Sequence, residues 1–173
     1  MTLTTATVEL RDIVTEDDVE AVMGLRRGPG QERYLGSIIS HFEDAIADAK
    51  ACPRMWSVHD GKTGELVGFV MISNDIPQAT LDADDDIVGP YFLWRLLIDA
   101  RHQGRGYGRA TIDAVADHVA ANENGRVLLT SCKAGEGSPQ PFYLHYGFER
   151  TGETKWGEDI LRLDLAGRNG GRG

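Results

Sequence analysis

Residues 103–108 read QGRGYG and combine a glycine-rich backbone with positive charge, two features that suit a phosphate group. Glycine occupies alternate positions: Gly104, Gly106 and Gly108. Arginines surround them: Arg101, Arg105 and Arg109. If a helix begins here, its free N–H groups and about half a positive charge at its first turn favour an anion, which glycine allows to approach closely. The stretch predicts a pyrophosphate-binding loop, and the plain alternative is a tight turn with solvated arginines.

Two familiar phosphate motifs do not fit this stretch. A Walker loop requires Gly-Lys-Ser or Gly-Lys-Thr after four spacer residues, which residues 103–108 lack. A dinucleotide fingerprint requires Gly-x-Gly-x-x-Gly, but counting from Gly104 puts Arg109 at the last position. The Walker and dinucleotide interpretations are therefore disfavoured.

Cysteine and histidine usage gives no sign of a metal site or a disulfide framework. Cys52 and Cys132 lie far apart, without a Cys-x-x-Cys pair or a Cys/His cluster. We expect Cys132 to be a small buried hydrophobe, because the sequence shows no base beside it that would activate the thiol. His102 and His145 are expected to be ordinary loop and helix residues.

Charge and composition limit the partners. Asp and Glu outnumber Lys and Arg by 27 to 18, and the resulting formal charge of −9 disfavours nucleic acid and favours cationic ligands. The sequence shows no apolar run long enough to cross a membrane and no secretory leader, so we expect a cytoplasmic protein without membrane partners. The length of 173 residues predicts a single domain over 1–166 and a flexible tail over 167–173.

The spacing of apolar residues predicts the helices and strands that precede the glycine loop and position it. Alternation predicts a strand over 6–13, and Thr15 followed by acids predicts a capped helix through about Leu25. A second helix is predicted over 37–49, with its apolar face formed by Ile38, Ile39, Phe42 and Ile46. Three strands follow, within MWSVHD, ELVGFVMISN and PYFLWRLLID. The third is nearly all apolar, as expected of a strand covered on both faces.

The second half continues the alternation of helix and strand. After the glycines, apolar residues at helical spacing predict a helix that ends at NENG, and RVLLTSC predicts a strand. SPQPFYLHYGF predicts a short helix that begins near Ser138. DILRLDLA predicts an edge hairpin strand. The order predicts a mixed α/β layer fold with a ligand site where the strand order switches.

The glycine loop resembles the acetyl-CoA loop of the GCN5-related N-acetyltransferases. Gln103, Gly106 and Gly108 match that loop in register, and PFYLHYGFERTGE resembles the family's later aromatic helix and its GF pair. The likeness covers nearly the whole chain and is closest to the bacterial spermine/spermidine acetyltransferase branch. It implies a mixed sheet of six to seven strands with about four helices, whose splayed central strands form the acetyl-CoA site.

The resemblance implies which residues hold the cofactor. Backbone amides would bind the CoA pyrophosphate from this run: Gln103, Gly104, Arg105, Gly106, Tyr107, Gly108 and Arg109. Backbone at Leu97 and Ile98 would pair with the pantetheine arm as if it were another strand. A free N–H at the splayed strand end would stabilise charge on the thioester oxygen, an effect often worth about 3 kcal/mol.

The resemblance also implies direct attack by an amine, with Tyr143 protonating the departing sulfur. Tyr146 lies three residues further along the same short helix and is expected to be a packing residue. No carboxylate occupies the central strand beside Trp94, which is expected in the core or in a pocket wall and is a candidate substrate contact. An acceptor for the amine's proton is therefore either a water chain or an acid from elsewhere.

Candidate acids for the substrate are Glu32 and the run Asp82–Asp86, within which Asp84, Asp85 and Asp86 precede the central strand. The ordinary alternative for such a run is a solvated loop. The expected substrate is a small cationic amine, first of all a polyamine. An aminoglycoside or another amine is the alternative enzyme substrate, and a non-catalytic acyl-CoA sensor is the alternative class. The resemblance further implies a homodimer that pairs through sheet edges.

Overall fold

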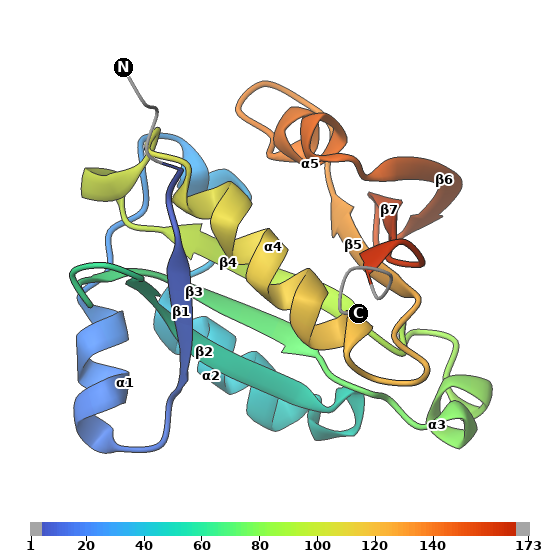
Figure 1. The fold of residues 1–173 in the computed structure, drawn as a ribbon. Helices are drawn as coiled ribbons and strands as arrows, with labels where there is room; N and C mark the ends of the chain where they lie inside the picture. The colour runs from blue at the N-terminus through green and yellow to red at the C-terminus, as the bar shows by residue number, and fades with distance from the viewer. Residues whose placement is uncertain (1–4, 169–173) are drawn as a thin grey trace.

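The computed structural model describes residues 5–168, which form a mixed seven-stranded sheet with helices on both faces (Figure 1). The strands are β1 (Val8–Asp12), β2 (Pro53–Asp60), β3 (Leu66–Ser73), β4 (Phe92–Ile98), β5 (Val127–Cys132), β6 (Glu149–Lys155) and β7 (Glu158–Asp164). The α-helices are α1 (Glu16–Met23), α2 (Ile38–Ala47), α3 (Gln78–Ala83), α4 (Tyr107–Ala120) and α5 (Gln140–Tyr146). The predicted fold class is confirmed.

The sheet order is β1-β2-β3-β4-β5-β7-β6, with every neighbouring pair antiparallel except β4 and β5. The parallel pair joins the two halves of the sheet through only two residue pairs, Phe92 with Leu129 and Leu93 with Thr130. Beyond Leu93, the partners assigned to β4 in the described chain lie on β3 alone. The two central strands therefore splay apart, as the resemblance implied.

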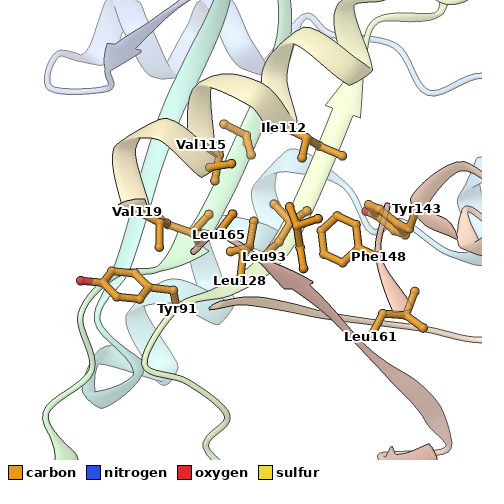
Figure 2. Packing of buried hydrophobic residues seen from close by; sticks show 14 of the residues in the cluster. Tyr91, Leu93, Ile112, Val115, Val119, Leu128, Tyr143, Phe148, Leu161 and Leu165 are labelled. Atoms are coloured by element: carbon orange, nitrogen blue, oxygen red, sulfur yellow. The ribbon is translucent and has the colours of Figure 1, made fainter. Parts of the chain in front are cut away.

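Two apolar clusters cover the two faces, and β3 serves both because its side chains alternate. Val70 and Ile72 join the cluster under α4 and α5, whose members around Leu93 are seen in Figure 2. Phe69 and Met71 join the other cluster, under α1 and α2. A strand covered on both faces loses the alternating pattern, which accounts for the apolar runs of β3 and β4.

Several local predictions are confirmed by the structure. Thr15 caps α1 in a capping box with Asp18, and Ser37 caps α2. The short aromatic helix, expected from near Ser138, begins at Gln140 as α5 after Pro139. Alternating and continuous apolar patterns correctly located β1, β2, β3, β4 and β5.

Two local predictions are wrong, and one short helix was missed. DILRLDLA forms β7, which is an interior strand between β5 and β6 rather than the edge. On α2, Ile39 and Ile46 are 52% and 80% exposed, because buried His41 takes a core-facing position that the apolar pattern assigned elsewhere. The six-residue helix α3 was not predicted, since one and a half turns are too short to show a period.

Arg168, the last residue that the structure describes, forms ion pairs with Asp113 and Asp117. Of the tail predicted over 167–173, residues 169–173 lie outside the described residues. Within 5–168, no helix is long and apolar enough to cross a bilayer. The same residues contain no group of three His, Cys, Asp or Glu side chains arranged to hold a metal ion.

Candidate active site

A cavity of about 490 Å³ occupies the gap between the splayed strands β4 and β5. Its walls come from β4, from the first turn of α4, from the C-terminal end of β5, from α5 and from the segment before α2. The glycine loop and Tyr143, which are separate in sequence, both line it. The structure therefore brings the main predicted site residues together.

The glycine loop forms one end of this cavity. Gly104 and Gly106 have φ values of +75° and +87°, a region that side chains other than glycine rarely adopt. Gly106 is the N-cap of α4 and its carbonyl accepts a hydrogen bond from Ala110 N at 3.0 Å. A Cβ at Gly104 would point into open space, with no atom within 4 Å. The loop thus presents bare backbone at the start of a helix, as a phosphate cradle requires.

Not every predicted cofactor residue faces the cavity. Its lining includes these members of the set: Ile98, Gln103, Gly104, Gly106, Tyr107, Gly108 and Arg109. Leu97 and Arg105 are absent from it; the Leu97 side chain is 1% exposed in the core, and Arg105 is exposed. The burial of the Leu97 side chain leaves only its backbone for the predicted contact with CoA, which stays a prediction.

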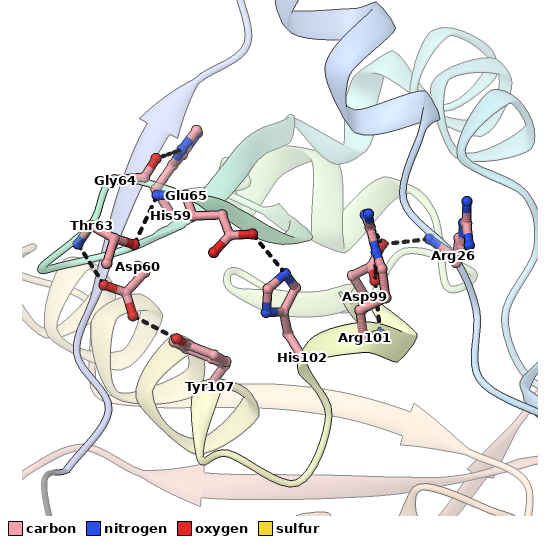
Figure 3. A network of polar contacts seen from close by, with 10 residues as sticks. All are labelled: Arg26, His59, Asp60, Thr63, Gly64, Glu65, Asp99, Arg101, His102 and Tyr107. Atoms are coloured by element: carbon pink, nitrogen blue, oxygen red, sulfur yellow. Dashed lines mark hydrogen bonds and ion pairs between the residues drawn. The ribbon is translucent and has the colours of Figure 1, made fainter.

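A buried carboxylate holds the start of the loop in place (Figure 3). Asp99 accepts hydrogen bonds from the backbone N–H groups of Arg26 and Arg101, and it pairs with the Arg101 guanidinium at 2.8 Å. These contacts, led by that of the Arg101 side chain, hold the pKa of Asp99 well below its usual range despite its burial. Arg101 therefore stabilises the conformation of the loop through its contacts with Asp99.

Two further contacts fix the loop from the sheet side. The Tyr107 hydroxyl donates to Asp60 at 2.5 Å, and this bond is the main cause of a strongly lowered Asp60 pKa. His102 is buried, with its Nε2 3.4 Å from a Glu65 carboxylate oxygen. Both pairs are drawn in Figure 3. Tyr107 anchors the first turn of α4, and His102 anchors the 3-10 turn before the glycine loop, to the hairpin between β2 and β3.

Gln103 connects the loop to the segment before α2. Its amide Nε2 donates to the Ile98 carbonyl at 2.9 Å and to Gln31 Oε1 at 3.0 Å. The side chain therefore ties the end of β4 to the 3-10 turn over Gln31–Arg33.

A bulge shapes the β4 wall. Met71 pairs with Arg95 and Ile72 with Leu93, so Trp94 is the extra residue of β4 in its pairing with β3. Trp94 lines the cavity, as predicted for a pocket wall. The bulge lies directly after Leu93, the last β4 residue that pairs with β5. Backbone groups of β4 are thus free of a second strand at this point.

Tyr143 and Tyr146 have different surroundings. Tyr143 lines the cavity, is 7% exposed and packs against Phe142 and Phe148 with ring centroids 5.5 and 5.4 Å away. Its burial raises the pKa strongly, so the hydroxyl keeps its proton at neutral pH. Tyr146 does not line the cavity; its hydroxyl contacts Asp113 at 2.5 Å and Arg168 at 2.6 Å.

Cys132 also lines the cavity. It is buried as predicted, and burial raises the pKa of its thiol to about 11, which keeps it protonated near neutral pH. A protonated thiol is a poor nucleophile, which agrees with the prediction that Cys132 is a packing residue.

The predicted substrate acids do not line the cavity, although Glu32 lies between two lining residues, Gln31 and Arg33. None of Glu32, Asp84, Asp85 and Asp86 is among its lining residues. Glu32 is exposed, Asp84 pairs with Lys50 at 2.6 Å, and Lys155 contacts the Asp85 carbonyl. The structure therefore does not bring these acids to the other site residues.

Sequence reasoning missed Glu158, the one carboxylate among the described residues that line the cavity. It begins β7 and reaches the cavity because β7 pairs with β5. That pairing joins segments that are distant in sequence, so no local pattern around Glu158 could have indicated its place.

Tyr34 closes the cavity from the side of the helices. Its hydroxyl donates to the Glu136 carbonyl at 2.6 Å, and it lines the cavity together with Gly137. Two loops separated by 102 positions in the chain therefore meet beside the site.

Comparison with solved structures shows that this architecture is that of acetyltransferases. An acetyltransferase from Thermus thermophilus matches with a TM-score of 0.61 at 22% identity, over 91% of this chain and 97% of that one. An aminoglycoside acetyltransferase AAC(6')-Ib in complex with coenzyme A matches with a TM-score of 0.69 at 16% identity, over 96% of this chain and all of that one.

The sequence itself defines the family. The model of the acetyltransferase (GNAT) domain matches residues 52–150, so the chain belongs to the GNAT acetyltransferase family, whose enzymes use acetyl-CoA. The spermine/spermidine N(1)-acetyltransferase of Bacillus subtilis (strain 168) is 28% identical over 153 residues, which are 88% of this chain and 95% of that protein. The resemblance inferred from the glycine loop is confirmed, and the protein is an acetyltransferase.

Proposed function

We propose that this acetyltransferase moves the acetyl group of acetyl-CoA onto a primary amine of a small cationic molecule, with spermine and spermidine as the first candidates. One observation carries the proposal: the cavity between β4 and β5 is lined by both the glycine loop and the buried residue Tyr143. The polyamine is suggested by the relative that is 28% identical over most of the chain.

The residues present fit the cofactor. Gly104 and Gly106 offer backbone in a left-handed conformation with open space in front of Gly104, where a pyrophosphate would meet free N–H groups of the α4 start. Arg109 adds a cation to the cavity lining. Because β4 lacks a second strand beyond Leu93, the backbone of Leu97 and Ile98 would hold the extended arm of CoA.

Acetyl-CoA, when bound, supplies the thioester carbonyl that the amine attacks. Tyr143, which lines the cavity and is protonated at neutral pH as any ordinary phenol is, would give its proton to the sulfur that leaves. Backbone freed by the bulge at Trp94 would donate to the thioester oxygen.

The amine must lose a proton before it attacks. With a pKa of about 10.4, roughly one part in a thousand is neutral at pH 7.4, which corresponds to about 4 kcal/mol. Water in the cavity would receive this proton, because the thiol of Cys132 and the phenol of Tyr143 are both already protonated.

A panel of amines tests the proposal. The protein is mixed with acetyl-CoA and spermine, spermidine, an aminoglycoside, hexylamine or no amine, and released thiol is measured. We expect rapid release with the polyamines and little without an amine. Thiol release with the aminoglycoside alone would show that the substrate is an aminoglycoside and not a polyamine. Tight acetyl-CoA binding without amine-dependent thiol release would favour a non-catalytic acyl-CoA sensor.

A further inference from the structure

Glu158 stands apart from the other charged residues of the cavity. The remaining ionisable charges of the described lining are cationic, from Arg33, Arg95, Arg109 and Lys133. A positive lining suits the phosphates of CoA, but it repels a cationic amine that must enter the same cavity. An amine substrate therefore needs a local negative charge, and Glu158 is the described lining residue that provides one.

The carboxylate of Glu158 is held in place by a neutral group. Its Oε2 accepts a hydrogen bond from the Ser131 hydroxyl at 2.5 Å, and Ser131 itself lines the cavity. Glu158 is half-buried at the start of β7, beside the strand end that carries Cys132. Its charge helps to raise the pKa of the Cys132 thiol, so it acts on the cavity wall.

Other acids near the cavity are already engaged by donors or cations. Asp159 accepts from the Gln140 amide at 2.9 Å, Asp44 pairs with Arg95 at 3.2 Å, and Glu65 faces His102. Within residues 5–168, Glu158 forms no ion pair. Its negative charge is thus available to a ligand, and its second oxygen can accept a hydrogen bond.

We propose that Glu158 binds an ammonium group of the acceptor amine within the cavity and thereby selects cationic acceptors. The inference rests on the proposed function and deepens it, since it names the residue that recognises the substrate class. Glu158 thus has the substrate-binding role that the sequence analysis gave to Glu32 and the acidic run Asp82–Asp86.

The test uses spermidine as the probe and Glu158→Gln as the variant. Glutamine keeps one oxygen that can accept the Ser131 hydrogen bond, but it removes the charge and replaces the second oxygen with an NH2 donor. Glu153→Gln is the matched control, because Glu153 is an exposed residue of β6 outside the cavity lining. Binding of spermidine to each protein saturated with CoA is measured by calorimetry, and KM and kcat are measured with acetyl-CoA.

We expect Glu158→Gln to weaken spermidine binding and to raise its KM about tenfold or more, with kcat within about threefold and acetyl-CoA affinity unchanged. Glu153→Gln should match the parent. Equal spermidine binding by Glu158→Gln and Glu153→Gln would overturn the inference, as would a parent protein that does not bind spermidine.

The two proposals fail in different ways. If the parent acetylates spermidine and Glu158→Gln does so with the same KM, the acetyltransfer proposal stands and the role of Glu158 is refuted. If the parent binds spermidine through Glu158 but releases no CoA, recognition by Glu158 is supported and the proposed reaction fails. A melting temperature of Glu158→Gln within about 3 °C of the parent shows that the fold is kept.

Discussion

Tyr143 and Tyr146 lie one helical turn apart, yet their hydroxyl groups have different partners. The Tyr146 hydroxyl is bonded to Asp113 and Arg168, and Arg109 lies over its ring at 5.1 Å. Tyr143 is enclosed by Phe142 and Phe148 and lines the cavity. A hydroxyl in a polar network stabilises the fold, whereas a protonated hydroxyl at a cavity can give its proton to a substrate.

Substitution of Tyr143 should therefore lower activity, whereas substitution of Tyr146 should lower stability. We expect Tyr143→Phe to lower kcat by about 10²- to 10³-fold, typical of lost general acid catalysis, with acetyl-CoA affinity kept. Tyr146→Phe should leave kcat nearly unchanged and lower the unfolding free energy by about 1–2 kcal/mol, because it removes the hydroxyl that bonds to both Asp113 and Arg168, although these two residues keep their ion pair with each other. Steady-state kinetics and urea unfolding check both, and an exchange of the two behaviours would show that Tyr146 is the donor.

His41 is a buried titratable residue beneath the cavity wall. Its Nδ1 accepts from Arg95 Nε at 3.1 Å, and its ring stacks on Phe69 at 6.0 Å. Burial, with a smaller effect from the Arg95 charge, lowers the His41 pKa from 6.5 to about 4. The folded protein therefore holds this side chain neutral at pH values where the unfolded chain protonates it.

The lowered pKa predicts a loss of stability as pH falls. Between about 6.5 and about 4 the unfolded state binds the proton and the folded state does not, so the unfolding free energy decreases toward acid. From pH 7.5 to pH 5.5 the contribution of His41 is about 1.4 kcal/mol. Urea unfolding should show a smaller acid loss for His41→Gln, by about 1 kcal/mol. An equal loss in parent and variant would contradict the assignment, since His118, whose pKa is also lowered, titrates in both.

At the scale of elements, the loop before α4 depends on backbone conformation. Gly104 has a φ of +75° and open space where a Cβ would point. Gly152 in β6 has a φ of +84° and similarly open space. A side chain at either position would cause the same backbone strain. Gly104 lines the cavity, however, and Gly152 does not.

Alanine at each glycine separates ligand binding from backbone strain. Gly104→Ala and Gly152→Ala should each lower the unfolding free energy by about 1 kcal/mol, the cost of placing a side chain in the left-handed region. Only Gly104→Ala should also weaken acetyl-CoA binding, by about tenfold or more, because its methyl group occupies the space of the pyrophosphate. Calorimetry and thermal unfolding make the comparison, and equal affinities would argue against the phosphate cradle.

Local signals explain which elements were predictable. Thr15 with Asp18, and the glycines before α4, act within a few residues, so the sequence alone locates them. β6 reads ERTGETK, without apolar alternation, since an edge strand largely faces solvent, and β7 was mistaken for the edge. The position of Glu158 depends on the pairing of Cys132 with Asp159, a contact between distant segments that no local pattern encodes.

At the scale of the whole molecule, charge is unevenly distributed. The chain carries a formal charge of −9, while the described cavity lining has four Lys and Arg side chains and one carboxylate. The acidic run over Asp84–Asp86 is attached through Asp84 to Lys50, away from the lining. Such exposed charges act on a ligand through solvent, where salt screens them over about 10 Å at 0.1 M.

This distribution predicts little effect from neutralising the acidic run. The triple substitution Asp84→Asn, Asp85→Asn and Asp86→Asn should change the spermidine KM by less than about twofold at 0.15 M salt, because the exposed charges are screened. The lost pair with Lys50 should cost at most about 1 kcal/mol of stability. Kinetics at 0.05 and 0.5 M salt test this. A tenfold rise in KM at both salt concentrations would show that the run contacts the substrate.

The pairing of β4 with β5 has a mechanical consequence. The half-sheet β1-β2-β3-β4 and the half-sheet β5-β7-β6 share a ladder of only two residue pairs, whereas each half is internally joined by longer antiparallel ladders. Under a force applied across the sheet, this joint carries the load over the fewest hydrogen bonds, so rupture starts there and each half initially keeps its own ladders. A ligand that spans the gap would add bonds in parallel with the two pairs and raise the rupture force.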